Sequence, residues 1–235
     1  MAKNQRKRKK TSISANKQLI QSIYDEPDFN YLNEKQQEFG SKINSNQIVL
    51  CSGPAGTGKS RISFMEALKL LHENNEYEKI IIITPAVESE ENLGHLPGDV
   101  HEKLEPFIYS SFYLIDGIIG KNEREVLRRE NILQVLALAH LRGINIDNTI
   151  LIFEEAQNST VNQMKLLLSR IGYNTKFIIS GDISQVDRFK KNQESGLIDS
   201  IERLQDIDDI EYVNFNDAEI VRNPLIEKIL EKYSS

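Results

Sequence analysis

Short apolar runs alternate along this chain with longer segments of helical periodicity. Three of the runs are continuous and rich in β-branched residues: Ile48 to Cys51, Lys79 to Thr84 and Thr149 to Phe153. Runs of this kind are typical of strands buried on both faces of a parallel sheet. Further strands are predicted at 132–138, 176–180 and 211–215. The alternation of strands with helical segments predicts an α/β fold of three layers, a mostly parallel sheet flanked by helices.

The helical segments place apolar residues three and four positions apart. Two helices, Gln18 to Tyr24 and Asn30 to Ile43, are predicted before the first strand. Later helices are predicted at 62–72, 123–130, 160–171, 193–204 and 224–233. The segment Val100 to Ile119 is also predicted to be helical, with a break near Pro106. Its aromatic residues are assigned to the core, with stacking on nucleic-acid bases as the alternative; they are Phe107, Tyr109, Phe112 and Tyr113.

Composition narrows the class of protein. A hydrophobic fraction of 39% in 235 residues predicts a packed globular domain. No apolar run is long enough to span a membrane, and no apolar segment follows the charged N-terminus, so a cytoplasmic protein without a membrane partner is expected. The single cysteine, Cys51, has no partner for a disulfide and no zinc-like spacing to histidines, and it is expected to be a core residue.

Charge is distributed unevenly along the chain. Residues 1–17 carry seven basic and no acidic side chains, whereas the whole chain has a net charge of −6. Such a tail, predicted to be disordered, fits either a salt-sensitive contact with nucleic acid or a solvated segment without a specific role. The remaining chain divides into a helical lead-in at 18–47 and a main domain at 48–235.

The segment 53–60 matches the phosphate-binding pattern G-x-x-x-x-G-K-[ST] without a mismatch. It lies between a predicted strand and a predicted helix, which is the context that the motif requires. Glycines let backbone N–H groups face phosphates, and a helix N-terminus favours an anion. Lys59 is therefore expected to reach the β- and γ-phosphates of ATP, and the Ser60 hydroxyl to hold Mg²⁺. The expected ATP-binding residues are Gly53, Pro54, Ala55, Gly56, Thr57, Gly58, Lys59 and Ser60.

Polar residues outside this loop complete the predicted site. Gln36 lies just upstream, where it is either a surface residue or a reader of the adenine edge through one donor and one acceptor. Glu154 and Glu155 follow the strand that ends at Phe153; the first is assigned to Mg²⁺ and the second to the attacking water. Gln185, supported by Asp182, is the candidate sensor of the γ-phosphate. The long connection 85–99 follows a strand, where ligands bind in α/β sheets.

Together these segments resemble the PhoH-like family of P-loop ATPases. The resemblance covers about residues 33–233 and rests on the segments 53–60, 85–99, 141–143, 154–158, 170–187, 195–197 and 221–224. It implies a RecA-like motor domain similar to those of superfamily 1 helicases, with ATP hydrolysis coupled to single-stranded RNA or DNA. It also implies a homo-oligomeric ring, a hexamer, in which Arg222 or Arg142 is the transition-state arginine. Arg222 is preferred.

Two positions depart from the family pattern. The usual aspartate of the Mg²⁺ motif is Glu154 here, whose added methylene shifts the carboxylate, and an arginine of the 85–99 region is replaced by Thr84. The first departure favours a second interpretation, a nucleotide-gated binding module with little turnover. A small-molecule kinase is a third interpretation, but it would need an arginine-rich lid, and Glu155 and Gln185 argue for hydrolysis.

Overall fold

A wholly parallel sheet of six strands forms the centre of the domain. The computed structural model describes residues 18–23, 30–84, 100–141, 143, 145–185, 194–221, 225, 226, 229 and 232. The strand order is β3-β2-β4-β5-β1-β6. The strands are β1 (Ile48–Ser52), β2 (Lys79–Thr84), β3 (Leu133–Ala137), β4 (Thr149–Phe153), β5 (Thr175–Gly181) and β6 (Ile210–Asn214). The predicted α/β fold is confirmed, and each predicted strand is present within two residues of its expected ends.

The burial of each strand follows its place in the sheet. Every residue of β1, β4 and β5 is buried. These three strands have a neighbour on each side, which explains their continuous apolar runs. Strand β3 lies at one edge and alternates between buried and partly buried residues, and β6 at the other edge is mostly partly buried. Cys51 is buried in β1 and is not in a disulfide, as its assignment to the core predicts.

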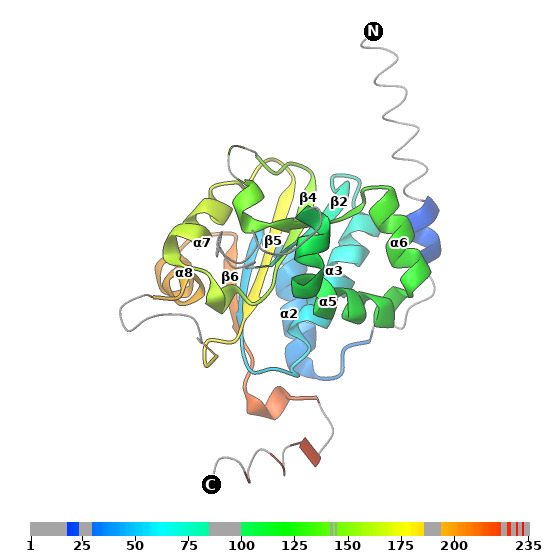
Figure 1. Ribbon diagram of the computed structural model, residues 1–235. Coiled ribbons are helices and arrows are strands. Elements are labelled where there is room, and N and C mark those ends of the chain that lie inside the picture. Colours follow the sequence, from blue (N-terminus) through cyan, green and yellow to red (C-terminus); the bar gives the residue numbers. More distant parts are fainter. Residues whose placement is uncertain are drawn as a thin grey trace.

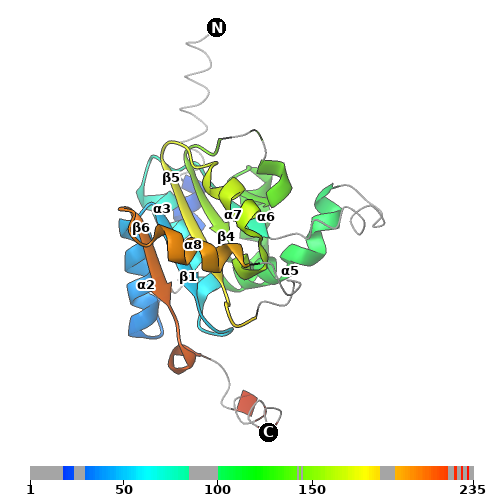
Figure 2. The ribbon, with the colours of Figure 1, turned by 90° about the vertical axis from the view of Figure 1, so that its left-hand side faces the viewer.

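Helices cover both faces of the sheet and complete the three layers (Figure 1). One face carries α2 (Glu34–Ser45), α3 (Lys59–Glu73), α5 (Val100–Ile119) and α6 (Lys121–Arg129). The other carries α7 (Val161–Leu168) and α8 (Gly196–Leu204), which lie in front of the strands in Figure 2. Alternate residues of β1 enter the two cores, because Val49 packs on the first face and Leu50 on the second.

Side-chain caps determine where two of the helices begin. The Asn33 side chain accepts a hydrogen bond from the Gln36 N–H at 2.9 Å, so α2 begins at Glu34 rather than at residue 30. Thr160 caps α7 in a capping box with Gln163. Residues 18–23 are helical, and so are residues 225, 226, 229 and 232 near the end of the chain.

Helix α5 differs from the prediction in two ways. The helix is continuous through Pro106. The assignment of its aromatic residues to the core is right for Phe112 but wrong for Tyr109 and Tyr113, whose exposed fractions are 70% and 74%. These two tyrosines are four residues apart and therefore share the outer face of the helix.

No helix in the described part of the chain is long and apolar enough to cross a membrane.

Polar contacts connect the turns at the amino ends of the strands. The Asp147 Oδ1 accepts a hydrogen bond from the Tyr173 N–H at 2.8 Å, and the Thr175 hydroxyl donates to the Ile146 carbonyl at 2.5 Å. The buried ammonium group of Lys176 donates to two carbonyl oxygens near the end of α2. Burial lowers the pKa of Lys176 to about 8.

Candidate active site

The loop after β1 adopts a conformation that depends on its glycines. Gly56 and Gly58 have φ values of 87° and 89°, in the left-handed region that side chains disfavour. A Cβ on Gly53 would lie 2.5 Å from the Cβ of Phe215, so this close approach also requires glycine. Helix α3 begins at Lys59, directly behind the loop. The segment therefore has the strand, loop and helix geometry of a phosphate-binding loop.

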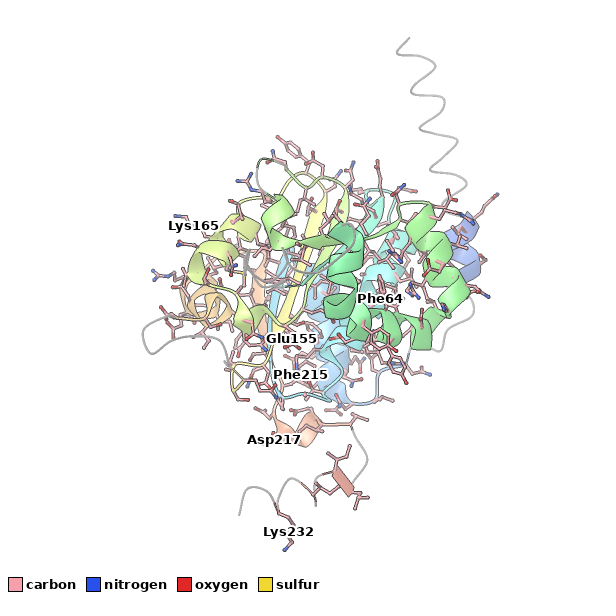
Figure 3. The ribbon with its side chains drawn as sticks, in the orientation of Figure 1. Phe64, Glu155, Lys165, Phe215, Asp217 and Lys232 are labelled. Carbon is pink, nitrogen blue, oxygen red and sulfur yellow. The ribbon has the colours of Figure 1, made fainter. Side chains whose placement is uncertain are left out.

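Three distant parts of the chain hold this loop. The Gly53 N–H donates to the carbonyl of Gly181 in β5 at 3.2 Å, and the Val221 N–H donates to the Gly56 carbonyl at 2.9 Å. The rings of Phe39 in α2 and Phe215 after β6 meet edge to face with centroids 5.8 Å apart. Figure 3 shows Phe215 at the lower, carboxyl end of the sheet. The loop is thus fixed by contacts with β5, α2 and the segment after β6.

Gln36 contacts the same loop. Its exposed fraction is 1%, and its Nε2 donates to the Thr57 carbonyl at 3.0 Å. Its Oε1 accepts a hydrogen bond from the Leu32 N–H at 2.9 Å. Both polar groups of the amide are therefore bonded to backbone, and the side chain supports the loop. Its predicted contact with adenine stays a prediction.

The donors of the loop suit an anion. The N–H groups of residues 55–58 donate to no acceptor among the residues that the structure describes. The Lys59 ammonium donates to the carbonyl oxygens of Gly53 and Pro54 at 2.6 and 2.9 Å. Burial lowers the pKa of Lys59. Unpaired N–H groups beside a partly buried amine form the donor set that a phosphate group requires.

Glu155 occupies an unusual position at the end of β4. Its φ of 53° lies in the left-handed region, and non-glycine residues there are often found at functional sites. The Gln157 Nε2 donates to the Glu155 Oε2 at 2.8 Å, and the Gln157 Oε1 accepts a hydrogen bond from the Asp182 N–H at 3.0 Å. A Cβ on Gly181 would lie 2.4 Å from the Gln157 Oε1. Gln157 therefore bridges Glu155 to the carboxyl end of β5.

The neighbouring Glu154 is held by other contacts. Its N–H continues the sheet by donating to the Ile83 carbonyl at 3.2 Å, and its Oε2 accepts a hydrogen bond from the Ser111 hydroxyl of α5. Its carboxylate and the Ser60 hydroxyl provide oxygen ligands of the kind that Mg²⁺ prefers. Among the described residues, no group of three or more His, Cys, Asp or Glu side chains could hold a metal ion.

Asp182 follows β5 beside these acids. Its Oδ1 accepts hydrogen bonds from the N–H and the hydroxyl of Ser184 at 3.0 and 2.6 Å. Its Oδ2 is buried and has no hydrogen-bond partner in the described structure. The Gln185 N–H donates to the Asp182 carbonyl at 3.0 Å, and the Gln185 side chain is exposed. The predicted sensor therefore shares a backbone turn with Asp182.

Several predicted residues lie outside the described part of the chain. They are Arg222, Arg142 and the segments 1–17 and 85–99. Val221, which precedes Arg222, is described and is bonded to the phosphate-binding loop.

Two residues of the site have no assigned role in the sequence interpretation. Gln157 lies in the quoted segment 154–158, but nothing there indicates that its amide joins two strands. Ser111 lies in a helix 43 residues before Glu154, and no sequence signal connects the two.

The parallel sheet, the glycine-dependent loop and the acids after β4 define a P-loop NTPase domain of the RecA-like type. A family model described as "PhoH-like protein" matches residues 29–234. The chain belongs to the PhoH-like family, which confirms the resemblance seen in the sequence.

Two curated relatives agree with this membership. The PhoH-like protein of Bacillus subtilis (strain 168) is 39% identical over 198 residues, which are 84% of this chain and 61% of the relative. The protein PhoH of Escherichia coli (strain K12) is 34% identical over 205 residues, which are 86% of this chain and 57% of the relative. The chain thus spans about 60% of the length of these curated relatives.

One solved structure has a similar fold. The large terminase of a thermophilic bacteriophage matches with a TM-score of 0.53 at 8% identity, over 86% of this chain and 50% of the terminase chain. This likeness concerns the fold alone.

Proposed function

We propose that this domain hydrolyses ATP with Mg²⁺ and couples hydrolysis to single-stranded RNA or DNA, as a helicase-like motor. The observation that carries the proposal is the position of Glu155. It follows β4 at the same carboxyl edge of the sheet where the phosphate-binding loop follows β1, with β5 between the two strands. A phosphate-binding loop alone would only hold a nucleotide. A carboxylate held at the same edge adds a base for the attacking water.

Each group has a separate role in this mechanism. The loop N–H groups and Lys59 bind the β- and γ-phosphates of ATP, and the Ser60 hydroxyl and the Glu154 carboxylate would hold Mg²⁺. When bound, Mg²⁺ would offset phosphate charge and stabilise the charge that develops during transfer. Glu155 accepts a proton from the attacking water, while its contact with Gln157 fixes the carboxylate.

The sensor is part of the same mechanism. Gln185 responds to the γ-phosphate, and Asp182 supports it through the turn that the two residues share. A structural change that follows loss of the γ-phosphate would then pass through this turn to β5.

The exposed tyrosines support a nucleic-acid partner. Tyr109 and Tyr113 present two adjacent aromatic faces on the outside of α5. Stacking of bases on exposed aromatic side chains contributes about 1–3 kcal/mol per base and tolerates any sequence. The basic residues of 1–17 would add contacts with the phosphate backbone. Hexameric assembly with Arg222 as the transition-state arginine, and a cytoplasmic location, belong to this proposal.

A nucleotide-gated binding module with little turnover is the second candidate. The observation that favours it is the glutamate at position 154, because its added methylene shifts the carboxylate that is assigned to the metal. In that case ATP would bind without being hydrolysed, and the bound nucleotide would control a nucleic-acid or protein partner.

Steady-state ATP hydrolysis tests the two candidates directly. The purified protein is measured with and without single-stranded RNA and single-stranded DNA. The Glu155→Gln variant is compared with Glu202→Gln, which changes an exposed acid on α8 in the same way. We expect nucleic acid to stimulate turnover and Glu155→Gln to lower kcat by about 10² to 10⁴-fold while ATP still binds. Normal turnover by Glu155→Gln would refute its role, and binding without turnover by the unaltered protein would favour the second candidate.

A further inference from the structure

Helix α5 contains two adjacent serines in different environments. Ser110 is exposed, whereas Ser111 has an exposed fraction of 5%. The Ser111 hydroxyl donates a hydrogen bond to the Oε2 of Glu154, at the carboxyl end of β4. A buried hydroxyl on one element thus contacts the carboxylate assigned to Mg²⁺ on another.

The position of Ser111 is fixed by its neighbour Phe112. The guanidinium groups of Arg124 and Arg128 in α6 lie 4.5 and 4.8 Å from the centroid of the Phe112 ring. Arg124 also forms a two-point ion pair with Asp116 in α5, at 2.5 and 3.2 Å. Helices α5 and α6 are therefore joined beside Ser111, and its hydroxyl is presented at a defined place.

A glutamate needs such a partner more than an aspartate does. Its side chain has an additional rotatable bond, so more rotamer freedom is lost when its carboxylate is ordered. Groups that hydrogen-bond to a metal-binding carboxylate fix its orientation, and their loss typically costs about 10- to 100-fold in metal affinity or activity.

We propose that Ser111 is a positioning residue that orients the Glu154 carboxylate for Mg²⁺ in the nucleotide site. One Glu154 oxygen accepts the hydrogen bond of Ser111, and the other would remain available to hold Mg²⁺. Ser111 itself does not contact the ion. The inference rests on the proposed function only in so far as that function assigns Glu154 to Mg²⁺.

The test measures nucleotide binding as a function of Mg²⁺ concentration, using ADP with a fluorescent label on the ribose. Ser111→Ala is compared with Ser111→Thr, which keeps the hydroxyl, and with the matched control Ser110→Ala. For Ser111→Ala we expect the Mg²⁺ concentration that half-maximally tightens ADP binding to rise about 10- to 100-fold. ADP affinity in EDTA should stay unchanged, because the loop and Lys59 are intact. Ser111→Thr and Ser110→Ala should behave like the unaltered protein.

A second comparison separates this role from a structural one. In a Glu154→Ala background, adding Ser111→Ala should not change the Mg²⁺ dependence further, since Ser111 acts through Glu154. If Ser111→Ala does not fold, Ser111→Cys replaces the hydroxyl with a weaker donor of similar shape and should show the same rise.

The outcomes distinguish this inference from the proposed function. An unchanged Mg²⁺ dependence in Ser111→Ala, or no Mg²⁺ effect on the unaltered protein, would overturn the positioning role. If Mg²⁺ tightens ADP binding through Ser111 but ATP is not hydrolysed under any condition, the positioning role stands and the ATPase proposal fails.

Discussion

The two edges of the parallel sheet differ in how their turns use left-handed backbone. At the amino edge, the residues with positive φ all lie just before a strand and are of types that tolerate this conformation: Asn131, Asn148, Asn174 and Asp209. At the carboxyl edge, the glycines of the phosphate-binding loop and Glu155 have positive φ values. A glutamate there has no such tolerance, so its conformation is imposed by its surroundings.

The edges also differ in how their polar groups are satisfied. At the amino edge, the carboxylate of Asp147 and the ammonium of Lys176 are bonded to backbone groups. At the carboxyl edge, the N–H groups of residues 55–58 and the Asp182 Oδ2 have no partner within the described residues. The amino edge therefore supports folding, whereas the carboxyl edge keeps donors and charges available for a ligand.

Among the variants that compare the two edges, Lys59→Ala should have the largest effect, and it should change nucleotide binding more than stability. Lys59→Ala removes the ammonium from the phosphate-binding loop, and a hydrogen bond to a charged group contributes about 1.5–3 kcal/mol. We therefore expect ATP and ADP affinity to fall by roughly 100-fold. Titration with fluorescent nucleotide measures the affinity, and thermal unfolding should change little.

Lys165→Ala is the control for this variant, because Lys165 is an exposed lysine on α7 (Figure 3). It should leave affinity unchanged. Equal losses in the two variants would show that Lys59 has no specific contact with phosphate.

Replacing Gly172 should change stability and leave nucleotide binding unaltered, in contrast to Lys59→Ala. A Cβ there would lie 2.0 Å from the Asp147 Oδ1 and 2.4 Å from the Ile146 carbonyl oxygen. Gly172→Ala should therefore lower the free energy of unfolding by about 1–3 kcal/mol, measured by chemical denaturation, without changing nucleotide affinity. Gly117→Ala is the matched control, because no described residue comes within 4 Å of a Cβ on this helical glycine, and it should stabilise the protein slightly. A loss of affinity in folded Gly172→Ala would contradict the separation of the two edges.

A graded effect on stability is expected from pH at Lys176. Its pKa is about 8 in the folded protein against 10.5 for an ordinary lysine, because burial disfavours the charged form. Unfolding therefore takes up a proton between about pH 8 and 10.5. The unfolding free energy of the unaltered protein should rise relative to that of Lys176→Met across this range, by at most about 1.4 kcal/mol per pH unit. Denaturation at about pH 7, 8, 9 and 10 measures the difference, and a constant difference would refute the shift.

The sequence predicts the strands and the phosphate-binding loop because their signals are local. The runs at 48–51 and 149–153 are apolar since these strands are buried on both faces, and the loop requires glycine at fixed positions. The acids Glu154 and Glu155 are found for the same reason, as they directly follow a recognisable strand.

Contacts between distant elements are not predictable in this way. The bonds of Ser111 to Glu154 and of Gln157 to Asp182 depend on which strands and helices become neighbours, and the periodicity of each segment does not contain that information. The exposure of Tyr109 and Tyr113 escapes prediction for a related reason. Both tyrosines fit an amphipathic helix, but the face that α5 turns to the sheet is selected by Phe112 and its packing against α6.

The contact between the Val221 N–H and the Gly56 carbonyl has a consequence for the energetics of binding. Together with Gly181 and Gln36, it restrains the phosphate-binding loop before any ligand arrives. A preorganised loop loses little conformational entropy on binding, so more of the contact energy appears as affinity. The same hydrogen bond couples the chain after β6 mechanically to the loop, because a displacement of Val221 acts directly on Gly56.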